Sequence, residues 1–107
     1  MVCSSPNFIA KEKAALESLT RTMAVELAAE AITANAVAPG PTETELFRTN
    51  NPPGSEGEAR YLRSVHMKRF AQPEEIAAAI AFLASEKAGV ITGQTLFIDG
   101  LASLASL

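Results

Sequence analysis

The sequence has 107 residues, of which 48% are hydrophobic and 20% are charged, and its formal net charge at pH 7 is -3. This length suits one domain, and the composition is that of a soluble globular protein, not of a disordered or fibrous chain. A net negative charge without a basic cluster argues against nucleic acid as a partner, and no apolar run is long enough to cross a bilayer. We therefore expect neither nucleic acid nor a membrane as a partner.

Cysteine and histidine usage excludes two further classes of site. The single cysteine, Cys3, cannot form an internal disulfide or a zinc site. No secretory leader is visible, so a cytoplasmic location is expected. The only histidine, His66, has no cysteine or carboxylate at metal-ligand spacing. The sequence therefore predicts no metal site.

Residues 10–30 have the pattern of a long helix. Apolar side chains recur at steps of three and four residues and form one stripe, and small side chains form a second face. The stripe consists of Leu16, Leu19, Met23 and Leu27. A helix with two such faces is expected to be covered twice, and the second cover is either another subunit or a neighbouring helix of the same chain.

Residues 32–38 are predicted to form a buried strand that stops at a fixed point. The segment carries no charge and is rich in β-branched residues, as in a parallel sheet with helices on both faces. Pro39 should end ladder pairing because it has no N–H, and Gly40 lets another group come close. With the hydroxyls of Thr42 and Thr44 behind it, this turn is a candidate binding edge. An ordinary strand-to-loop turn is the alternative, and it stays open.

Residues 41–70 are the most irregular part of the chain. A breaker at Asn50–Gly54 separates two halves, and a short helix is expected near residues 56–66. A long connection of this kind inside a compact domain is typical of a functional loop, so we interpret it as a substrate lid.

A helix over residues 73–86 and a strand over residues 95–98 complete the pattern. Pro73 and the carboxylates behind it suit a helix start, and the uncharged run 76–84 indicates burial around most of the helix. Gly89 is expected to be a left-handed residue past the helix end. The whole is predicted to be an α/β fold with a few parallel strands and open sheet edges, which resembles part of a larger domain.

Five segments together resemble the C-terminal half of the short-chain dehydrogenase/reductase family. They are Lys13–Glu17, Thr20–Leu27, Ile32–Gly40, Gln72–Ala77 and Ile91–Gly100. The resemblance covers about residues 10 to 100. It implies a partial Rossmann-like fold, a doubly wound parallel sheet here without its glycine-rich cofactor loop. It also implies NAD or NADP as cofactor and hydride transfer between the nicotinamide and a carbonyl or alcohol carbon of a small molecule.

The resemblance assigns roles to individual positions. Lys13 matches the lysine that bonds the nicotinamide ribose and lowers the pKa of a tyrosine acid/base. Pro39 and Gly40 match the turn beside the nicotinamide, and Thr44 matches the hydroxyl that bonds the carboxamide. Ser5 resembles the serine that orients the carbonyl, which makes Lys13 and Ser5 the candidate catalytic residues. Members of the family commonly form homo-oligomers.

The sequence also departs from the family pattern. Ile9 stands four residues before Lys13, where the family has its tyrosine, and Ser5 is closer to Lys13 than the family serine is. No glycine-rich loop opens a helix, so the pyrophosphate site is absent from this sequence. We expect an oxidoreductase represented here by a truncated chain that is inactive alone. The alternative is a non-catalytic pseudo-enzyme or assembly subunit that docks through its long helix.

Overall fold

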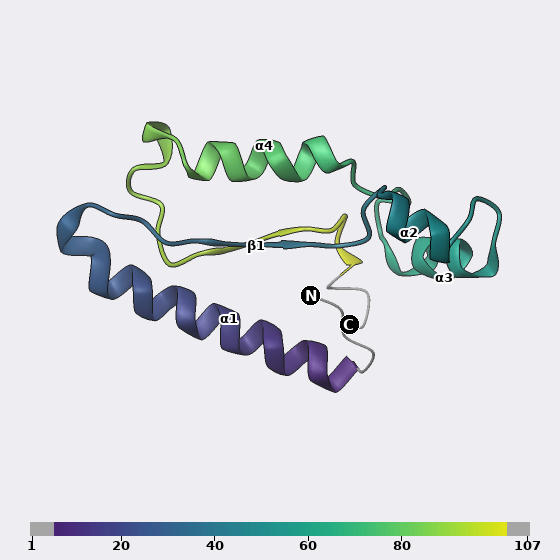
Figure 1. The fold of residues 1–107 in the computed structure, drawn as a ribbon, viewed down its shortest axis with the longest axis horizontal. Helices are drawn as coiled ribbons and strands as arrows, with labels where there is room; N and C mark the ends of the chain where they lie inside the picture. The colour runs from purple at the N-terminus through teal and green to yellow at the C-terminus, as the bar shows by residue number, and fades with distance from the viewer. Residues whose placement is uncertain (1–5, 103–107) are drawn as a thin grey trace. The chain divides into compact units, whose positions relative to one another are not determined.

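The computed structural model describes residues 6–102, with side chains from residue 14 onward. Helices and two short strands follow one another as Figure 1 shows. In chain order the elements are α1 (Pro6–Leu27), a 3-10 turn η1 (Ala28–Glu30), β1 (Ala36–Pro39), α2 (Glu45–Asn50), α3 (Glu56–Ser64), α4 (Pro73–Leu83), a 3-10 turn η2 (Glu86–Ala88) and β2 (Thr95–Ile98).

The chain divides into two compact units. Among the described residues, unit 1 comprises 6–36 and 85–96, and unit 2 comprises 37–84 and 97–102. No helix within residues 6–102 combines the length and the apolar character that a membrane crossing requires.

Helix α1 of unit 1 buries a narrow face of small side chains. Thr20 and Ala24 are 7% and 5% exposed, and the Thr20 hydroxyl donates to the carbonyl of Leu16 at 2.7 Å. Leu19 of the predicted apolar stripe is 55% exposed. The helix begins at Pro6 and ends at Leu27, so the last residues of the helix expected over 10–30 form η1 instead. The buried face therefore lies beside the predicted stripe, and most of that stripe is uncovered.

Asn35 holds the loop that precedes β2. Its Nδ2 donates to the carbonyl of Ile91 at 2.9 Å, and its Oδ1 accepts from the amide of Gln94 at 3.1 Å. The Gln94 carbonyl in turn accepts from the amide of Ala36 at 2.8 Å, which begins the strand pairing. Two further hydrogen bonds join the same segments. The Gly93 amide donates to the Ala34 carbonyl at 2.8 Å, and the Ala34 amide donates to the Thr92 hydroxyl at 3.0 Å.

Strands β1 and β2 pair in parallel (Figure 1). Donors at residues 36 and 40 reach acceptors at residues 94 and 98, so both strands advance in the same direction. The predicted strand 32–38 is shorter and later than expected, because residues 34 and 35 bond the 91–94 loop before the regular ladder begins.

Pro39 does not end the pairing, contrary to the expectation from the sequence. It is the last residue of β1, and the Gly40 amide still donates to the Ile98 carbonyl at 3.0 Å. Successive residues of a strand direct their N–H groups to opposite edges, and Ala36 and Gly40 share the edge that faces β2. The N–H that Pro39 lacks would therefore point away from β2, so the proline costs no bond in this pair.

Helix α4 of unit 2 begins as predicted from its proline but ends earlier and is less buried. The Glu75 carboxylate accepts from the Gln72 amide at 2.9 Å, which closes the first turn. The helix stops at Leu83, and Phe82 is 47% exposed. The expectation that this uncharged helix is buried around most of its circumference is therefore wrong among the described residues, which leave Ile80 and Phe82 exposed.

Gly89 is likewise not the left-handed cap expected after α4. Its φ is -62°, in the right-handed region, and its amide donates to the Glu86 carbonyl at 3.1 Å. The 3-10 turn η2 intervenes between α4 and this glycine, so the residue closes that turn and not the helix. Ala88, only 1% exposed, anchors the turn within unit 1.

Candidate functional site

The turn after β1 brings the chain against the end of β2. Gly40 lacks a side chain at a point where an added Cβ would lie 2.6 Å from Cβ and 2.9 Å from Cα of Asp99. Atoms at that separation overlap, so any larger residue would push the two strand ends apart. The group that approaches Gly40 closely is thus another part of the same chain. This packing accounts for the glycine without a ligand.

Two threonine hydroxyls follow the turn and differ in their bonding. Thr42 is half-buried, and its hydroxyl donates to the Gly40 carbonyl at 2.8 Å. Thr44 is exposed and caps α2, because its Oγ1 accepts from the Phe47 amide at 3.1 Å. Accepting that bond leaves the Thr44 hydroxyl hydrogen without an acceptor among the described residues. Thr44 can therefore donate to a group outside unit 2, while Thr42 is committed to the turn.

The two ends of the lid are tied together at its base. Thr42 and Ala71 form a parallel bridge. The Glu43 amide donates to the Ala71 carbonyl at 2.8 Å, and the Ala71 amide donates to the Pro41 carbonyl at 3.1 Å. Within the predicted lid 41–70, residues 43–70 therefore leave and return at one place, and we call this segment the lid from here on.

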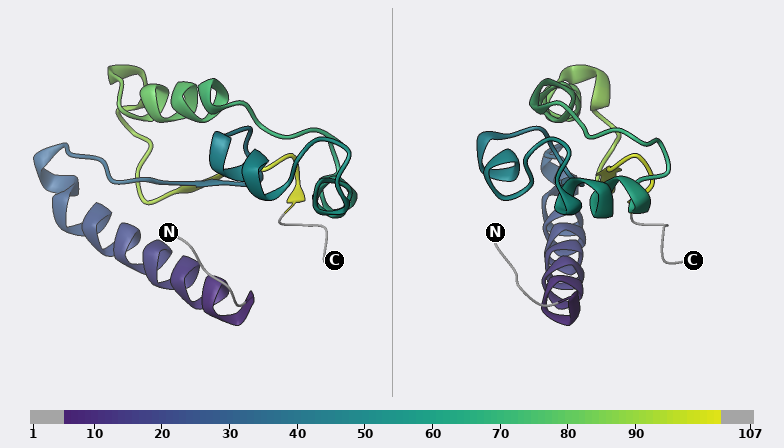
Figure 2. Two further views of the ribbon diagram at one scale, coloured as in Figure 1. Left: turned by 45° about the vertical axis from the view of Figure 1, so that its right-hand side comes forward. Right: turned by 90° about the vertical axis from the view of Figure 1, so that its right-hand side faces the viewer.

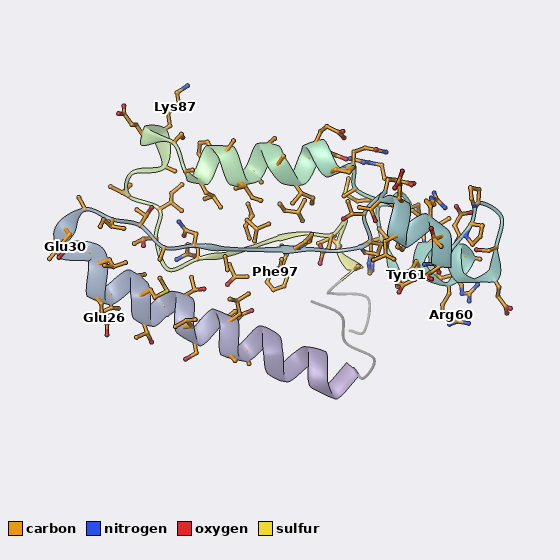
Figure 3. The ribbon with its side chains drawn as sticks, viewed as in Figure 1. Glu26, Glu30, Arg60, Tyr61, Lys87 and Phe97 are labelled. Carbon is orange, nitrogen blue, oxygen red and sulfur yellow. The ribbon has the colours of Figure 1, made fainter. Side chains whose placement is uncertain are left out.

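The lid has an aromatic interior built from both of its halves. Helices α2 and α3 are separate short segments joined by a loop (Figure 2). The Phe47 ring of α2 meets Tyr61 of α3 edge-on, with centroids 5.3 Å apart, and Phe70 at 5.0 Å. Figure 3 labels Tyr61 on α3. Phe70 is 5% exposed. Because the three rings come from distant positions of the loop, they join its two halves around the buried Phe70, while Tyr61 stays 42% exposed.

The end of the lid packs on the turn after β2. Gly100 has a φ of 58°, and an added Cβ there would lie 2.8 Å from Cγ1 of Val65, which is 1% exposed. The Met67 amide donates to the Gly100 carbonyl at 3.1 Å, and Nδ1 of His66 lies 3.1 Å from the Leu101 carbonyl. His66 thus bonds the main chain. Within residues 6–102, histidine, cysteine, aspartate and glutamate side chains do not gather into a group of three that could hold a metal.

Arg48 is the charged centre of the lid. Its Nε and Nη2 donate to the two oxygens of Glu43 at 2.7 and 2.6 Å, and its Nη1 donates to Glu58. These hydrogen bonds lower the pKa of Glu43 and of Glu58 and raise that of Arg48. The Gly54 amide, which donates to Glu58 at 3.0 Å, lowers the Glu58 pKa further. The three side chains therefore stay ionised as one cluster at neutral pH.

The site residues proposed from the sequence lie in different parts of the chain. Pro39, Gly40 and Thr44 follow one another at the end of β1, in unit 2. Lys13 lies on α1, in unit 1, and its side chain is not among those described. Ser5 lies outside the described residues. The catalytic and cofactor roles of these five positions therefore stay predictions.

Sequence reasoning missed the groups that fix the lid. Arg48 and its partners stand five and ten residues apart along the chain, which matches neither a helix nor a strand period. One signal was present, since Thr44 precedes a short helix in the manner of an N-cap. The cross-loop contacts to Phe70 and Ala71 had no signal of that kind.

Comparisons with known proteins give consistent results. A family model described as enoyl-(acyl carrier protein) reductase matches residues 1–100. The 3-oxoacyl-(acyl-carrier-protein) reductase of Vibrio cholerae is 42% identical over 91 residues, which are 85% of this chain and 36% of that protein. The chain thus spans about a third of the length of the curated relatives that it matches.

Two solved structures have the same arrangement of elements. A double mutant of a short-chain dehydrogenase/reductase from Serratia marcescens superposes with a TM-score of 0.83 and 38% identity, over 96% of this chain and 40% of its own. A 4-hydroxyisoleucine dehydrogenase in complex with NADH superposes with a TM-score of 0.75 and 28% identity, over 86% of this chain and 37% of its own.

Proposed function

We propose, since this chain belongs to the short-chain dehydrogenase/reductase family, that it supplies the nicotinamide-side wall and the substrate lid of an NAD(P)-dependent oxidoreductase. One observation carries the proposal. The segment from Pro39 to Thr44 leaves the carboxyl end of β1, beside the end of β2, and leads directly into a lid tied at that same edge. Ligands of open α/β sheets bind at this edge.

Thr44 is the group in unit 2 that best fits a nicotinamide. It is exposed, and its hydroxyl hydrogen is available while its oxygen and carbonyl are held by the amides of Phe47 and Arg48 at 3.1 and 2.9 Å. Such a donor can bond the carboxamide oxygen and so orient the ring. The cofactor, when bound, accepts or donates the hydride. Lys13 would bond the ribose, as the resemblance implies.

The substrate would be a small molecule with a carbonyl or alcohol carbon. The lid, residues 43–70, would cover it and exclude water from the reacting atoms. Exposed apolar side chains in this loop, Leu46 and Met67 at 67% and 62%, suit the apolar part of such a substrate. Either NAD or NADP would suit this role.

The proton transfer is not assigned to these residues. Ile9 occupies the position of the family tyrosine, and an isoleucine neither donates nor accepts a proton. General acid–base catalysis contributes about 10² to 10⁴ in rate, so we expect this chain by itself to turn over substrate very slowly. Its contribution would be cofactor orientation and substrate enclosure.

Nicotinamide mononucleotide is the sharpest probe, because it carries the nicotinamide and ribose without the adenosine half. We expect saturable shifts of the main-chain NMR signals of residues 39–44 on titration. Thr44→Val should weaken the affinity about fivefold by removing one hydrogen bond. Thr49→Val is the matched control, since Thr49 is an exposed threonine of the lid whose hydroxyl donates to the Glu45 carbonyl. Equal affinities for both variants, or no shifts in the parent chain, would refute the proposal.

A non-catalytic role in assembly is the second candidate, and the surface of α1 favours it. Leu16, Leu19 and Met23, which lie on one face of the helix, are between 43% and 55% exposed. An apolar helix face of this kind is typical of an interface, and homo-oligomers are expected in this family. Leu19→Asp should convert an oligomer to a monomer on a sizing column, whereas an unchanged elution volume would remove this candidate.

A further inference from the structure

The Arg48 side chain contacts residues from several separate parts of the lid. Its guanidinium bonds Glu43 at the start of the lid and Glu58 on α3, and Nη1 also donates to the Asn51 carbonyl at 3.3 Å. The same group lies 5.3 Å from the centroid of the Phe70 ring at the lid's end. One cation therefore joins the beginning, the middle and the end of the loop.

Thr44 lies between the groups that Arg48 holds. On one side, the Glu43 amide is tied to the Ala71 carbonyl, and the Glu43 carboxylate is held by the guanidinium. On the other side, the Arg48 amide itself donates to the Thr44 carbonyl at 2.9 Å. The residue that would bond the nicotinamide is thus fixed from both directions by the side chain and main chain of Arg48.

The surroundings of the cluster make these bonds stronger than ordinary surface ion pairs. The side chains of Arg48, Glu43 and Glu58 are 26%, 26% and 19% exposed. Partial burial reduces screening, and a planar guanidinium with a two-bond contact to a carboxylate is a stronger and more directional pair than a single contact. Arg69 and Glu75 also make a two-bond contact, but they are 55% and 40% exposed, and their pair joins the end of the lid to α4.

The helices that the cluster joins are too short to persist by themselves. Helix α2 has 6 residues and α3 has 9. Isolated helices of this length are unstable in water, so tertiary contacts must hold them. The edge-on contact of Phe47 with Tyr61 and the bond from Arg48 to Glu58 both connect α2 with α3.

We propose that Arg48 is a positioning residue that holds the lid as one preformed body and thereby fixes the Thr44 hydroxyl. This inference rests on the proposed function, because it assigns Thr44 the bond to the nicotinamide. It also makes a separate claim about the lid. The lid already has its folded conformation before a substrate binds, and it does not fold over the substrate on binding. Specificity would then come from a lid surface that exists before the substrate binds. Because the lid is already ordered, binding would cost little conformational entropy.

The test compares Arg48→Met with Arg69→Met by amide hydrogen exchange. Both substitutions remove an arginine from an ion pair with glutamate, and only the first removes the link across the lid. For Arg48→Met we expect about tenfold faster exchange at the amides of residues 47–58, with residues 34–36 and 93–94 of unit 1 unchanged. Arg69→Met should leave both sets unchanged. Unchanged lid exchange in Arg48→Met, or equal acceleration in both units, would overturn the proposal.

A second readout separates a positioning role from general stability. Arg48→Lys keeps the charge but loses the two-bond contact and the planar stacking, so we expect only partial recovery of lid protection and of the nicotinamide mononucleotide shifts at Thr44. Full recovery by lysine would mean that charge alone is needed and would contradict the proposal.

If Arg48→Met fails to fold, Glu58→Gln replaces it as the decisive variant. Glutamine preserves the size of the side chain and an acceptor for the Gly54 amide while removing the charge that faces Arg48. Faster lid exchange in this variant supports the proposal, and parent-like exchange contradicts it. A parent chain that shows lid protection sensitive to Arg48 but no response to the nucleotide would refute only the proposed function.

Discussion

Unit 1 and the lid of unit 2 are held by different chemistry. In unit 1, neutral groups of Asn35 and the 91–94 loop exchange hydrogen bonds, and small side chains on α1 allow close packing. In the lid, aromatic rings and one arginine with two carboxylates connect the segments. The neutral bonds fix strand register, which any member of the fold needs. The charged cluster fixes one loop conformation, which a specific ligand would need.

The comparison implies that the two regions respond differently to the same perturbation. Main-chain and amide bonds are insensitive to pH and to a single change of charge, whereas an ionised cluster loses its partners when either sign of charge is removed. A substitution in one region should therefore leave amide protection in the other region largely intact.

The largest effect is expected at the core of the lid. Phe70→Ala removes a ring that is 5% exposed and contacts both Phe47 and Arg48, so it should destabilise the lid by about 3–5 kcal/mol. Urea unfolding followed by fluorescence can report this, because Tyr61 is the only tyrosine and tryptophan is absent. Phe82→Ala, at a 47% exposed position, is the control. Equal destabilisation by both would contradict a distinct lid core.

The next effect is expected where the two strands end. Gly40→Ala places a methyl group 2.6 Å from Cβ of Asp99, and relieving that overlap should cost about 2 kcal/mol. Gly89→Ala is the matched change in unit 1, since φ there is right-handed and the nearest atom to an added Cβ is the Glu86 carbonyl oxygen at 3.2 Å. Thermal unfolding midpoints of the two variants should differ clearly, and similar midpoints would refute the contact.

A smaller effect is expected from the neutral clamp of unit 1. Asn35→Ala leaves the Gln94 amide and the Ile91 carbonyl without partners, at a cost of about 1 kcal/mol because the site is only partly buried. Amide exchange should accelerate at residues 91–94 and not at residues 47–58. Asn50→Ala, at the exposed end of α2, should change neither set. Acceleration in the lid by Asn35→Ala would show that the two regions are coupled.

The sequence predicted the fold class and the family, and both are confirmed. The uncharged, β-branched segments before Gly40 and before Asp99 indicated parallel strands, and these strands pair in parallel in a fold shared with solved family members. Such features are local, because strand pattern and helix periodicity are set by neighbours along the chain. The same reasoning placed Thr44 in the loop after the strand 32–38, but it did not predict α2, the helix that Thr44 caps.

The rest depended on contacts between distant positions. Nothing near Gly40 in the sequence indicates that Asp99 would fill the space beside it, and nothing near Arg48 indicates that Glu58 and Phe70 would surround it. The exposure of Phe82 on an uncharged helix was missed for a related reason. Apolar composition predicts a preference for burial, but only the rest of the molecule decides whether that face is covered.

Acid is the gentlest perturbation that should separate the two regions. Glu43 and Glu58 have a lower pKa in the folded lid than in an unfolded chain, because Arg48 bonds their ionised forms. A lowered folded pKa contributes stability that is fully present above the unfolded value of roughly 4.3 and is lost as the pH falls through the folded values. The lid should therefore loosen on the acid side, and raising the pH above neutrality should not strengthen it.

The measurement follows the Tyr61 signal and the amides of residues 93–94 as the pH falls from neutral to about 2, the direction in which the carboxylates of Glu43 and Glu58 become protonated. The lid signal should change first, while the neutral bonds of Asn35 keep unit 1 protected. Arg69 also lowers the pKa of Glu75, to about 2, but that pair lies outside the lid interior and should not move the Tyr61 signal. The Arg48→Met variant lacks the bonds to Glu43 and Glu58, so its Tyr61 signal should show no acid transition. A transition that persists in this variant would mean that groups other than this cluster cause it.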